Sequence, residues 1–302
     1  MFAMQLALLS NLPARRQGGT LSVGESLASH GPEVIYREVT CRNVLGRSPA
    51  AEKMGYPFSW TVNPYRGCEI GCTYCYARAT HEYLGADPQA FENEIFVKLG
   101  AERTVARALR PEHFRNGNAG GAEIAIGTVT DPYQPAERRY RLTRRILERL
   151  VHFSGLTLSV TTKSPLVTDD AELLGSIARK SDLTVHMSLI SLDADLLRHL
   201  EPKGATPEAR LSAIARLTAA GVRVGLFIMP LIPGLNDDPA AVRRLEAAAR
   251  SAGAAFVVRQ RLSLRDATWP TLEASLREHY PEVHRNLSRR MLSRSLRQQK
   301  TA

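Results

Sequence analysis

Short runs of apolar and β-branched residues alternate with helical stretches along most of the chain. The apolar runs are Phe58–Tyr65, Ala122–Val129, Leu156–Thr162, Leu183–Leu189, Val222–Met229 and Ala255–Arg261. The intervening helical stretches are Tyr74–Leu84 with Ala101–Leu109, Ala136–Phe153, Asp169–Arg179, Pro207–Ala220 and Pro239–Ala252. Runs of this length and composition are typical of strands. Strands that alternate with helices predict an α/β fold with a parallel sheet and right-handed crossovers.

Several predicted helices carry clear signals at their ends. Thr206-Pro207 and Asp238-Pro239 each place a capping residue before a proline that opens a helix. Gly155, Gly221 and Gly253 follow helix ends, where a left-handed residue is favoured. The pattern contains six strand–helix units, two fewer than a closed eight-stranded barrel. Taken alone, it fits either a partial barrel or a doubly wound sheet.

This pattern divides the chain into three parts. Residues 1–57 have weak periodicity, and we expect them to form an irregular leader that packs on the core. Residues 58–265 form the predicted core domain. Residues 266–302 are predicted to form a basic helical extension, with helices at Thr271–Tyr280 and Val283–Leu296.

The composition is that of a globular protein. The apolar content of 44% supports a packed core, and no apolar run approaches the length of a membrane span. The first residues lack the features of a signal peptide. Only four cysteines are present, three of them grouped, which argues against a disulfide scaffold and for a reducing compartment. We therefore expect a cytoplasmic protein without a membrane segment.

Positive charge is concentrated near the C-terminus. The net charge is +10, and a basic surface favours polyanions such as nucleic acids. From Pro281 onward, Glu282 alone opposes the basic residues Arg285, Arg289, Arg290, Arg294, Arg297 and Lys300. This tail is either a solvated helix end or a contact surface for nucleic acid or another anionic partner.

Three cysteines, Cys68, Cys72 and Cys75, occur in the spacing C-x3-C-x2-C. Gly67 and Gly71 allow the backbone to bend tightly between them, so three thiolates can converge. Soft thiolates suit an iron–sulfur cluster or zinc. A structural zinc site normally has a fourth ligand, yet Cys41 lies 27 residues upstream and His81 follows Cys75 at a long spacing. Three ligands would leave one iron of a [4Fe–4S] cluster open.

The residues around these cysteines resemble a known family. The string N-P-Y-R-G-C-x-x-G-C-x-Y-C-Y-A-R, from Asn63 to Arg78, is similar to the spore-photoproduct-lyase-like branch of the radical S-adenosylmethionine (SAM) superfamily. An aromatic residue before the third cysteine, here Tyr74, is part of that signature. The resemblance implies a partial (β/α)6 TIM-type barrel with Cys68, Cys72 and Cys75 on a [4Fe–4S] cluster. It also implies SAM as cofactor and a one-electron donor of the flavodoxin or ferredoxin type.

The same resemblance assigns roles to residues that follow the second predicted strand. Thr130, Asp131 and Gln134 stand where superfamily members hold the methionine amino group, although the usual Gly-Gly-Glu segment is missing. Two prolines make this loop rigid. The alternative is a turn fixed by its prolines, with an Asp helix cap.

Later strand ends supply further candidates. The resemblance implies that Ser188 contacts the SAM ribose or carboxylate and that Arg210 pairs with the methionine carboxylate, which suits its fork-shaped guanidinium. For Arg210 the alternative is a surface charge. Lys163 follows the third predicted strand, and we expect it either to contact a carboxylate or phosphate of a ligand or to be solvated. We expect His186 to be a core histidine rather than a proton donor.

The sequence thus predicts a radical SAM enzyme that cleaves SAM reductively to a 5′-deoxyadenosyl radical. Its substrate is not identified, and a nucleic acid is one candidate. Repair of a thymine lesion is disfavoured, because Thr128–Asp131 contains no cysteine to return a hydrogen atom and Cys41 would have to reach in from the leader. The alternative is a non-catalytic iron–sulfur or zinc module that binds nucleic acid.

Overall fold

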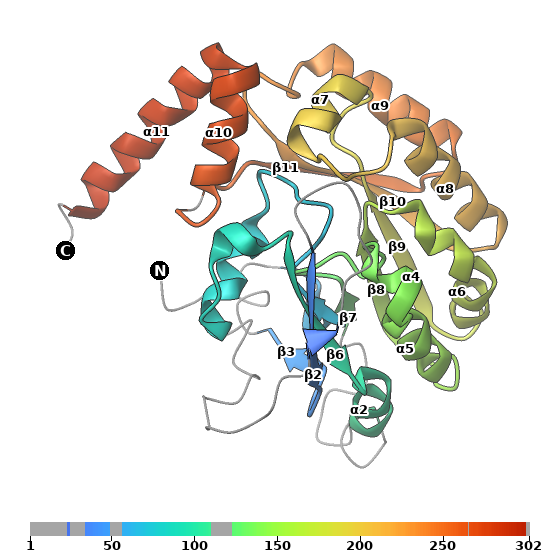
Figure 1. The fold of residues 1–302 in the computed structure, drawn as a ribbon. Coiled ribbons are helices and arrows are strands. Elements are labelled where there is room, and N and C mark those ends of the chain that lie inside the picture. Colours follow the sequence, from blue (N-terminus) through green and yellow to red (C-terminus); the bar gives the residue numbers. More distant parts are fainter. Residues whose placement is uncertain (1–22, 25–33, 49–55, 110–122, 265, 300–302) are drawn as a thin grey trace.

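The computed structural model describes residues 23–24, 34–48, 56–109, 123–264 and 266–299, with side chains of the last helix described up to residue 291. The protein has a mixed α/β fold with two sheets (Figure 1). The larger sheet has the strand order β11-β10-β9-β8-β7-β4-β3, and the smaller one the order β1-β2-β6-β5.

The larger sheet is parallel except at one edge. Its parallel strands are β4 (Phe58–Val62), β7 (Glu123–Ile126), β8 (Thr157–Thr162), β9 (Asp182–Ser188), β10 (Arg223–Leu231) and β11 (Phe256–Arg261). The short strand β3 (Leu45–Arg47) pairs antiparallel with β4. Each predicted apolar run therefore overlaps a strand of this sheet, and the predicted parallel pairing is confirmed.

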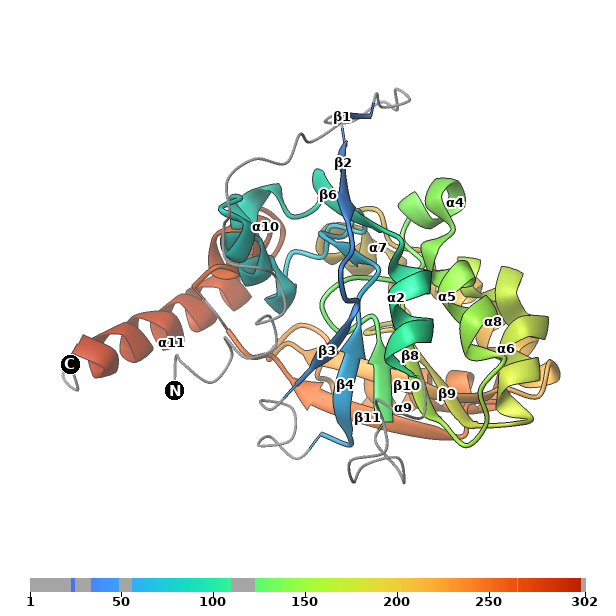
Figure 2. The same ribbon diagram turned by 90° about the horizontal axis from the view of Figure 1, so that it is seen from below.

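Helices cover the outer side of this sheet (Figure 1, Figure 2). They are α5 (Leu142–Leu150), α6 (Ala171–Ala178), α8 (Pro207–Ala219) and α9 (Pro239–Ser251), preceded by the short α4 (Ala136–Tyr140) and the 3-10 helix η5 (Pro165–Asp170). Their buried apolar residues, such as Ile146, Leu174 and Ile214, belong to the same core as the strands. Thr206 and Asp238 cap α8 and α9 through their side chains, as the sequence predicted.

One predicted helix is interrupted. Residues 136–153 were expected to be continuous, but Arg141 has a left-handed backbone with φ 49° that separates α4 from α5. The side chain of Glu137 explains the new start, because its carboxylate accepts from the backbone N–H groups of Thr143 (3.1 Å) and Arg144 (3.0 Å). These are amide groups at a helix N-terminus that need an acceptor.

The smaller sheet corrects part of the leader prediction. It consists of β1 (Val23–Gly24), β2 (Ile35–Thr40), β6 (Glu94–Leu99) and β5 (Tyr65–Arg66). The described part of residues 1–57 thus contains the strands β1, β2 and β3, where weak periodicity led us to expect irregular structure. These strands form through pairing with distant segments, since β2 runs parallel to β6 and β3 extends the larger sheet. The proposed domain boundaries themselves stay a prediction.

The remaining helices lie between β5 and β6, directly after β6, after β9 and after β11. They are the 3-10 helices η3 (Tyr76–Leu84) and η4 (Pro88–Ala90), then α2 (Ala101–Ala108), α7 (Ala194–Leu200), α10 (Trp269–His279) and α11 (Pro281–Gln299). α11 projects from the body of the molecule in both views (Figure 1, Figure 2). Across the described ranges, no helix combines the length and apolar character needed to span a bilayer. The Gly117–Gly121 stretch, which the sequence predicts to be a loop before the second strand, and the first 22 residues lie outside the described part.

We expected His186 in the core, but it is half-buried and packs against aromatic rings of the neighbouring strands, outside the main apolar core. Its ring stacks on Phe227 with a centroid separation of 4.0 Å, and Phe256 meets it edge-on at 5.8 Å. Burial, helped by the charge of Arg223, lowers the pKa of His186 from 6.5 to about 4. The imidazole is therefore neutral at pH 7 in the folded protein.

This burial predicts an acid-sensitive stability. Between pH 6.5 and 4 the unfolded chain binds a proton at His186 that the folded chain does not, so stability should fall as the pH is lowered through this range. The expected contribution is about 2–3 kcal/mol. Urea unfolding at pH 7 and pH 4 would measure it, with His186→Phe as the variant that keeps a stacked ring but cannot titrate. Equal losses of stability in both proteins would contradict the prediction.

Candidate active site

The loop that carries the three cysteines follows β5 and is shaped by Gly67. This glycine has φ +86°, and a Cβ atom built on it would lie 2.5 Å from the backbone oxygen of Glu94 in β6. Gly71 also has a positive φ, +68°, but the nearest atom to a Cβ there is 3.5 Å away. Both positions favour glycine because of their left-handed backbone, and Gly67 is also needed because no side chain fits beside β6.

A Gly67→Ala variant should therefore be damaged much more than Gly71→Ala. Both changes strain the backbone, which costs about 1–3 kcal/mol, but Gly67→Ala must also push β6 away from the loop. The free energies of unfolding of the two variants, from urea titrations, test this difference. If Gly71→Ala is as destabilised as Gly67→Ala, the close approach of β6 is not the cause.

The three thiols are free and lie close to one another. Cys68 and Cys72 are buried, and Cys75 is partly buried. Burial raises the pKa of all three, that of Cys72 to about 12, and the charge of Asp131 raises the pKa of Cys68 further. The free thiols are thus protonated at neutral pH, and a metal that binds them must displace protons.

The thiols do not converge as the ligands of a single ion would. Within the described ranges, no group of three His, Cys, Asp or Glu residues is arranged to hold one metal ion. His81, the other candidate zinc ligand, instead uses Nε2 to bond the backbone oxygen of Glu94 at 3.0 Å. In an iron–sulfur cluster each cysteine binds a different iron, so its thiols stand farther apart. The described residues therefore single out neither zinc nor a cluster, and the choice between them stays a prediction.

The loop after β7 is hydrogen-bonded to the cysteine loop. The hydroxyl of Thr130 and Nε2 of Gln134 both donate to the backbone oxygen of Gly67, at 2.6 and 3.2 Å. Oε1 of Gln134 accepts from the N–H of Glu69 at 3.0 Å, and the carboxylate of Glu69 accepts from the N–H of Ala136 at 2.7 Å. Thr130 and Gln134, predicted to contact SAM, are thus brought to the cysteines, with their side chains bonded to the protein.

Asp131 joins the same loop to the end of β8. Its carboxylate accepts from the N–H of Tyr133 (2.9 Å), the hydroxyl of Thr162 (2.6 Å) and the N–H of Lys163 (2.7 Å). The carboxylate is buried. Three donors are what a buried carboxylate needs, so this side chain fixes the relative position of two strand ends.

A buried ion pair lies behind Tyr74. The hydroxyl of Tyr74 donates to the carboxylate of Glu201, which also pairs with Nη2 of Arg210. Both side chains of the pair have no exposed surface. Burial alone would raise the pKa of Glu201, but the charges of Arg210 and Lys163 outweigh it and lower this pKa. Tyr74 is thus held from the α7 side of the site.

Arg210 is not the surface charge that we considered as an alternative. Its remaining nitrogens donate to backbone oxygens, Nη1 to Ser188 (3.0 Å) and Nε to Ala205 (3.0 Å). All its nitrogens therefore have protein acceptors, and the structure pairs it with Glu201 where we expected the methionine carboxylate. The guanidinium connects Tyr74, at the cysteines, with the end of β9.

Two polar side chains at the ends of the neighbouring strands β8 and β9 are not fully used by the described part of the protein. The ammonium of half-buried Lys163 lies 5.7 Å from the centre of the Tyr74 ring. Burial opposes its charge, but Cys72 and Glu201 favour it and raise the pKa of Lys163 above its usual value. Ser188 is buried, and its hydroxyl has no hydrogen-bond partner in the described part of the chain.

Sequence reasoning missed Arg78, which supports the cysteine loop through the backbone of Cys72. Its side chain is fully buried, with Nη2 donating to the backbone oxygen of Cys72 (3.2 Å) and Nη1 to Glu92 (2.6 Å). It also missed Glu69 and Glu201. Arg78 and Glu69 lie inside the quoted motif, which holds three charged residues with Arg66, and charges in a string rich in cysteine, glycine and aromatic residues were the available signal.

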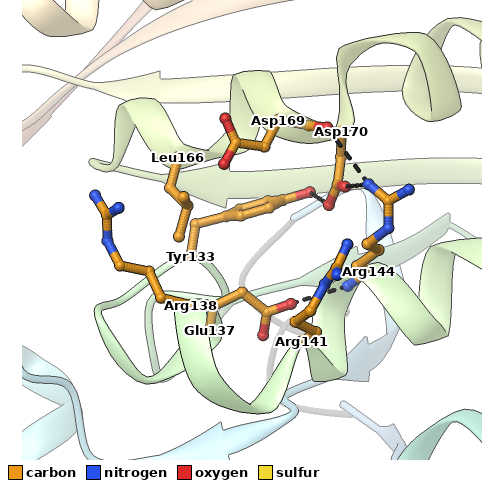
Figure 3. Close-up of a pocket in the computed structure, with 8 residues that line it drawn as sticks. All are labelled: Tyr133, Glu137, Arg138, Arg141, Arg144, Leu166, Asp169 and Asp170. Atoms are coloured by element: carbon orange, nitrogen blue, oxygen red, sulfur yellow. Dashed lines mark hydrogen bonds and ion pairs between the residues drawn. The ribbon is translucent and has the colours of Figure 1, made fainter.

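A pocket of about 370 Å³ lies against the same loop after β7 (Figure 3). Asp170 accepts from the hydroxyl of Tyr133 (3.0 Å) and from Arg144 (2.6 Å) at its wall. Its full lining is Tyr133, Glu137, Arg138, Arg141, Arg144, Leu166, Asp169 and Asp170. Three arginines face three acids, so the pocket carries no excess charge, and the cysteines do not line it.

Comparison with solved structures supports the fold. Spore photoproduct lyase complexed with a dinucleoside spore photoproduct superposes with a TM-score of 0.61 at 15% identity, covering 82% of this chain and 66% of that one. A mutant of that enzyme with bound AdoMet gives a TM-score of 0.56 at 14% identity, over 74% of this chain and 62% of that one. The protein thus spans somewhat less than two thirds of these solved chains.

Sequence comparison identifies the family. An uncharacterized protein of Mycobacterium tuberculosis is 36% identical over 261 residues, covering 85% of this chain and 74% of that protein. An uncharacterized protein of Methanocaldococcus jannaschii is 30% identical over 178 residues, 59% of this chain and 62% of that protein. The family model of the radical SAM superfamily matches residues 62–245. The chain therefore belongs to the radical SAM superfamily, whose members are enzymes that use a [4Fe–4S] cluster and SAM.

Proposed function

We propose that Cys68, Cys72 and Cys75 hold a [4Fe–4S] cluster with one iron left open for SAM. The observation that carries this proposal is the set of three neighbouring free thiols in the C-x3-C-x2-C spacing. The residues present fit such a cluster, because sulfur ligands suit iron and a cation, Lys163, lies close enough to Cys72 to offset negative charge. No fourth metal-binding side chain joins them in the described part of the protein.

A bound cluster and SAM would supply the radical chemistry, which is a one-electron reductive cleavage of the sulfonium of SAM. The protein binds and orients the cofactors and the substrate, and it excludes water from the site. We assign Lys163 to a carboxylate of the ligand, because its ammonium is charged and half-buried, and Ser188 to a ligand oxygen, because its hydroxyl is unused. Arg210 acts through Glu201 and Ser188 as a positioning residue.

The methionine part of SAM would be bound by the backbone of the loop that contains Thr130, Asp131 and Gln134, and not by the ends of these side chains. Their side chains already bind Gly67, Glu69 and the end of β8. The backbone carbonyls of a loop held so firmly remain suitable acceptors for an amino group. Tyr74 would line the site from the cysteine loop.

The proposed architecture is a partial (β/α)6 barrel over residues 58–265, with the leader before it and the helical extension after it. The parallel strands from β4 to β11 and the helices on their outer side support this description. The cysteine loop follows β4, and in such folds the loops at the carboxyl ends of strands build the active site.

The proposed substrate is still open, with nucleic acid as one candidate. The net charge of +10 and the exposed Arg285, Arg289 and Arg290 of α11 favour a polyanion. An electron donor of the flavodoxin or ferredoxin type, in a reducing compartment such as the cytoplasm, would complete the system. Photoproduct repair itself is disfavoured, because no cysteine occurs in Thr128–Asp131.

Anaerobic reconstitution tests the enzymatic proposal directly. The protein should take up the iron and sulfide of a [4Fe–4S] cluster, and with dithionite and SAM it should release methionine and 5′-deoxyadenosine. The alternative, a non-catalytic module on nucleic acid, predicts no 5′-deoxyadenosine, no change of the cluster spectra on addition of SAM, and DNA or RNA affinity independent of SAM. If protein with a complete cluster shows these three results, the non-catalytic alternative is correct and our proposal is wrong.

A further inference from the structure

The start of α10 reaches back to the cysteine loop. The hydroxyl of Thr268 donates to the backbone oxygen of Cys75 at 3.0 Å, and Thr268 has no exposed surface. Thr268 occupies the N-cap position of α10, where a threonine would ordinarily bond its own helix, but its side chain makes no such bond. The hydroxyl is therefore committed to the third cysteine at the expense of its helix.

The segment around Thr268 is held in place by neighbours on both sides. On one side, Gln89 donates from Nε2 to the backbone oxygen of Ala267 (3.2 Å) and accepts from the hydroxyl of Thr271 (2.5 Å). α10 and the teal segment that contains Gln89 lie side by side in both views (Figure 1, Figure 2). The contact with Cys75 is thus made from a fixed element.

On the other side, α10 is anchored to α7. The hydroxyl of Ser275 donates to the backbone oxygen of His199 at 2.9 Å, and the hydroxyl of Tyr280 bonds Nδ1 of His199 at 2.9 Å. The rings of His199 and His279 stack with centroids 3.8 Å apart. α10 therefore cannot shift without moving the end of α7.

α7 is in turn hydrogen-bonded to the cysteine loop, so α10, α7 and this loop are all connected to one another. The N–H of Thr73 donates to the backbone oxygen of Leu200, the last residue of α7, at 2.8 Å. The short stretch between Thr73 and Cys75 is thus tied at one end to α7 and at the other to Thr268. Thr268 lies beyond residues 62–245, the range matched by the superfamily.

We propose that Thr268 is a positioning residue for the third cluster cysteine. Its hydrogen bond fixes the peptide of Cys75 and so the direction in which the thiolate meets its iron, an inference that rests on the proposed cluster. Partners that orient metal ligands tune both the retention of the metal and its electronic properties. The C-terminal extension is then part of the active site rather than an appendage.

The test compares Thr268→Val, Thr268→Ser and Thr271→Val in the full-length, reconstituted protein. Thr268→Val keeps the shape of the side chain and removes the hydroxyl, and should lose iron to a ferrous chelator about tenfold faster or more. The electron paramagnetic resonance spectrum of its reduced cluster should also shift. Thr268→Ser should behave like the wild type. Thr271→Val is the matched control, because it disturbs the same helix start but loses only its bond to Gln89.

The outcomes separate this inference from the proposed function. If the wild type forms no cluster, the proposed function fails. If it forms one and Thr268→Val matches it in chelation rate and spectrum, the role of Thr268 is wrong while the function stands. If Thr271→Val has the same defects as Thr268→Val, general disturbance of α10 explains both and the inference is overturned. Should Thr268→Val not fold, Thr268→Ala removes the same hydroxyl and is judged by the same criteria.

Discussion

A Cys72→Ala variant is expected to assemble no [4Fe–4S] cluster and to release no 5′-deoxyadenosine from SAM. Cys72 is one of three thiols, and no other His, Cys, Asp or Glu in the described residues joins them as a substitute ligand. The apo protein should still fold, because alanine replaces a small buried side chain. Iron content, visible absorption after anaerobic reconstitution and chromatography of the SAM products measure the loss.

Cys41→Ala provides the matched control for this experiment. Cys41 lies next to Thr104, with its sulfur 3.9 Å from the threonine hydroxyl, and bonds no residue of the cysteine loop. This variant should take up iron and cleave SAM like the wild type. Retention of a complete cluster by Cys72→Ala, or its loss in Cys41→Ala, would mean that the ligand set is wrong.

An Arg210→Met variant is expected to lose about 3–5 kcal/mol of unfolding free energy, the usual cost of leaving one partner of a buried ion pair alone. Glu201 would keep only the hydroxyl of Tyr74 as a donor, and the backbone oxygens of Ser188 and Ala205 would each lose one. Urea unfolding of the apo protein at pH 7 gives the change. The effect should be large because both side chains are fully buried.

The double variant Glu201→Leu with Arg210→Met separates pairing from packing. Since it removes both charges, it should be more stable than Arg210→Met alone. If the double variant is as unstable as the sum of the two single variants, the two side chains contribute independently and the ion pair does not explain the loss.

The main sheet was accessible from sequence, because each of its parallel strands is a local apolar run between helix signals. The strand β6 was not, since Glu94–Leu99 becomes a strand only by pairing with β2 and β5, which are separated from it in the chain. The break at Arg141 was equally hidden. It depends on Glu137 turning its carboxylate to the start of α5 instead of to solvent.

The three cysteines could be proposed as cluster ligands from sequence because their spacing alone suggests that role, which stays a prediction. The SAM contacts expected of Thr130 and Gln134 stay a prediction, and their hydrogen bonds to the cysteine loop depend on how two loops meet, which no local pattern reveals. The burial of Arg210 depends on Glu201 across a helix boundary. Thr268 is 193 residues from its partner Cys75, and nothing in its surrounding sequence indicates a role.

The smaller sheet has a practical consequence for anyone who shortens this protein. β2 covers one side of β6, and the other side of β6 supports β5 immediately before Gly67. A version trimmed to begin at β4 would leave the backbone of β6 as an open edge directly behind the cysteine loop. Such a version would invite aggregation and a poorly formed metal site, so residues 34–48 belong in any minimal domain.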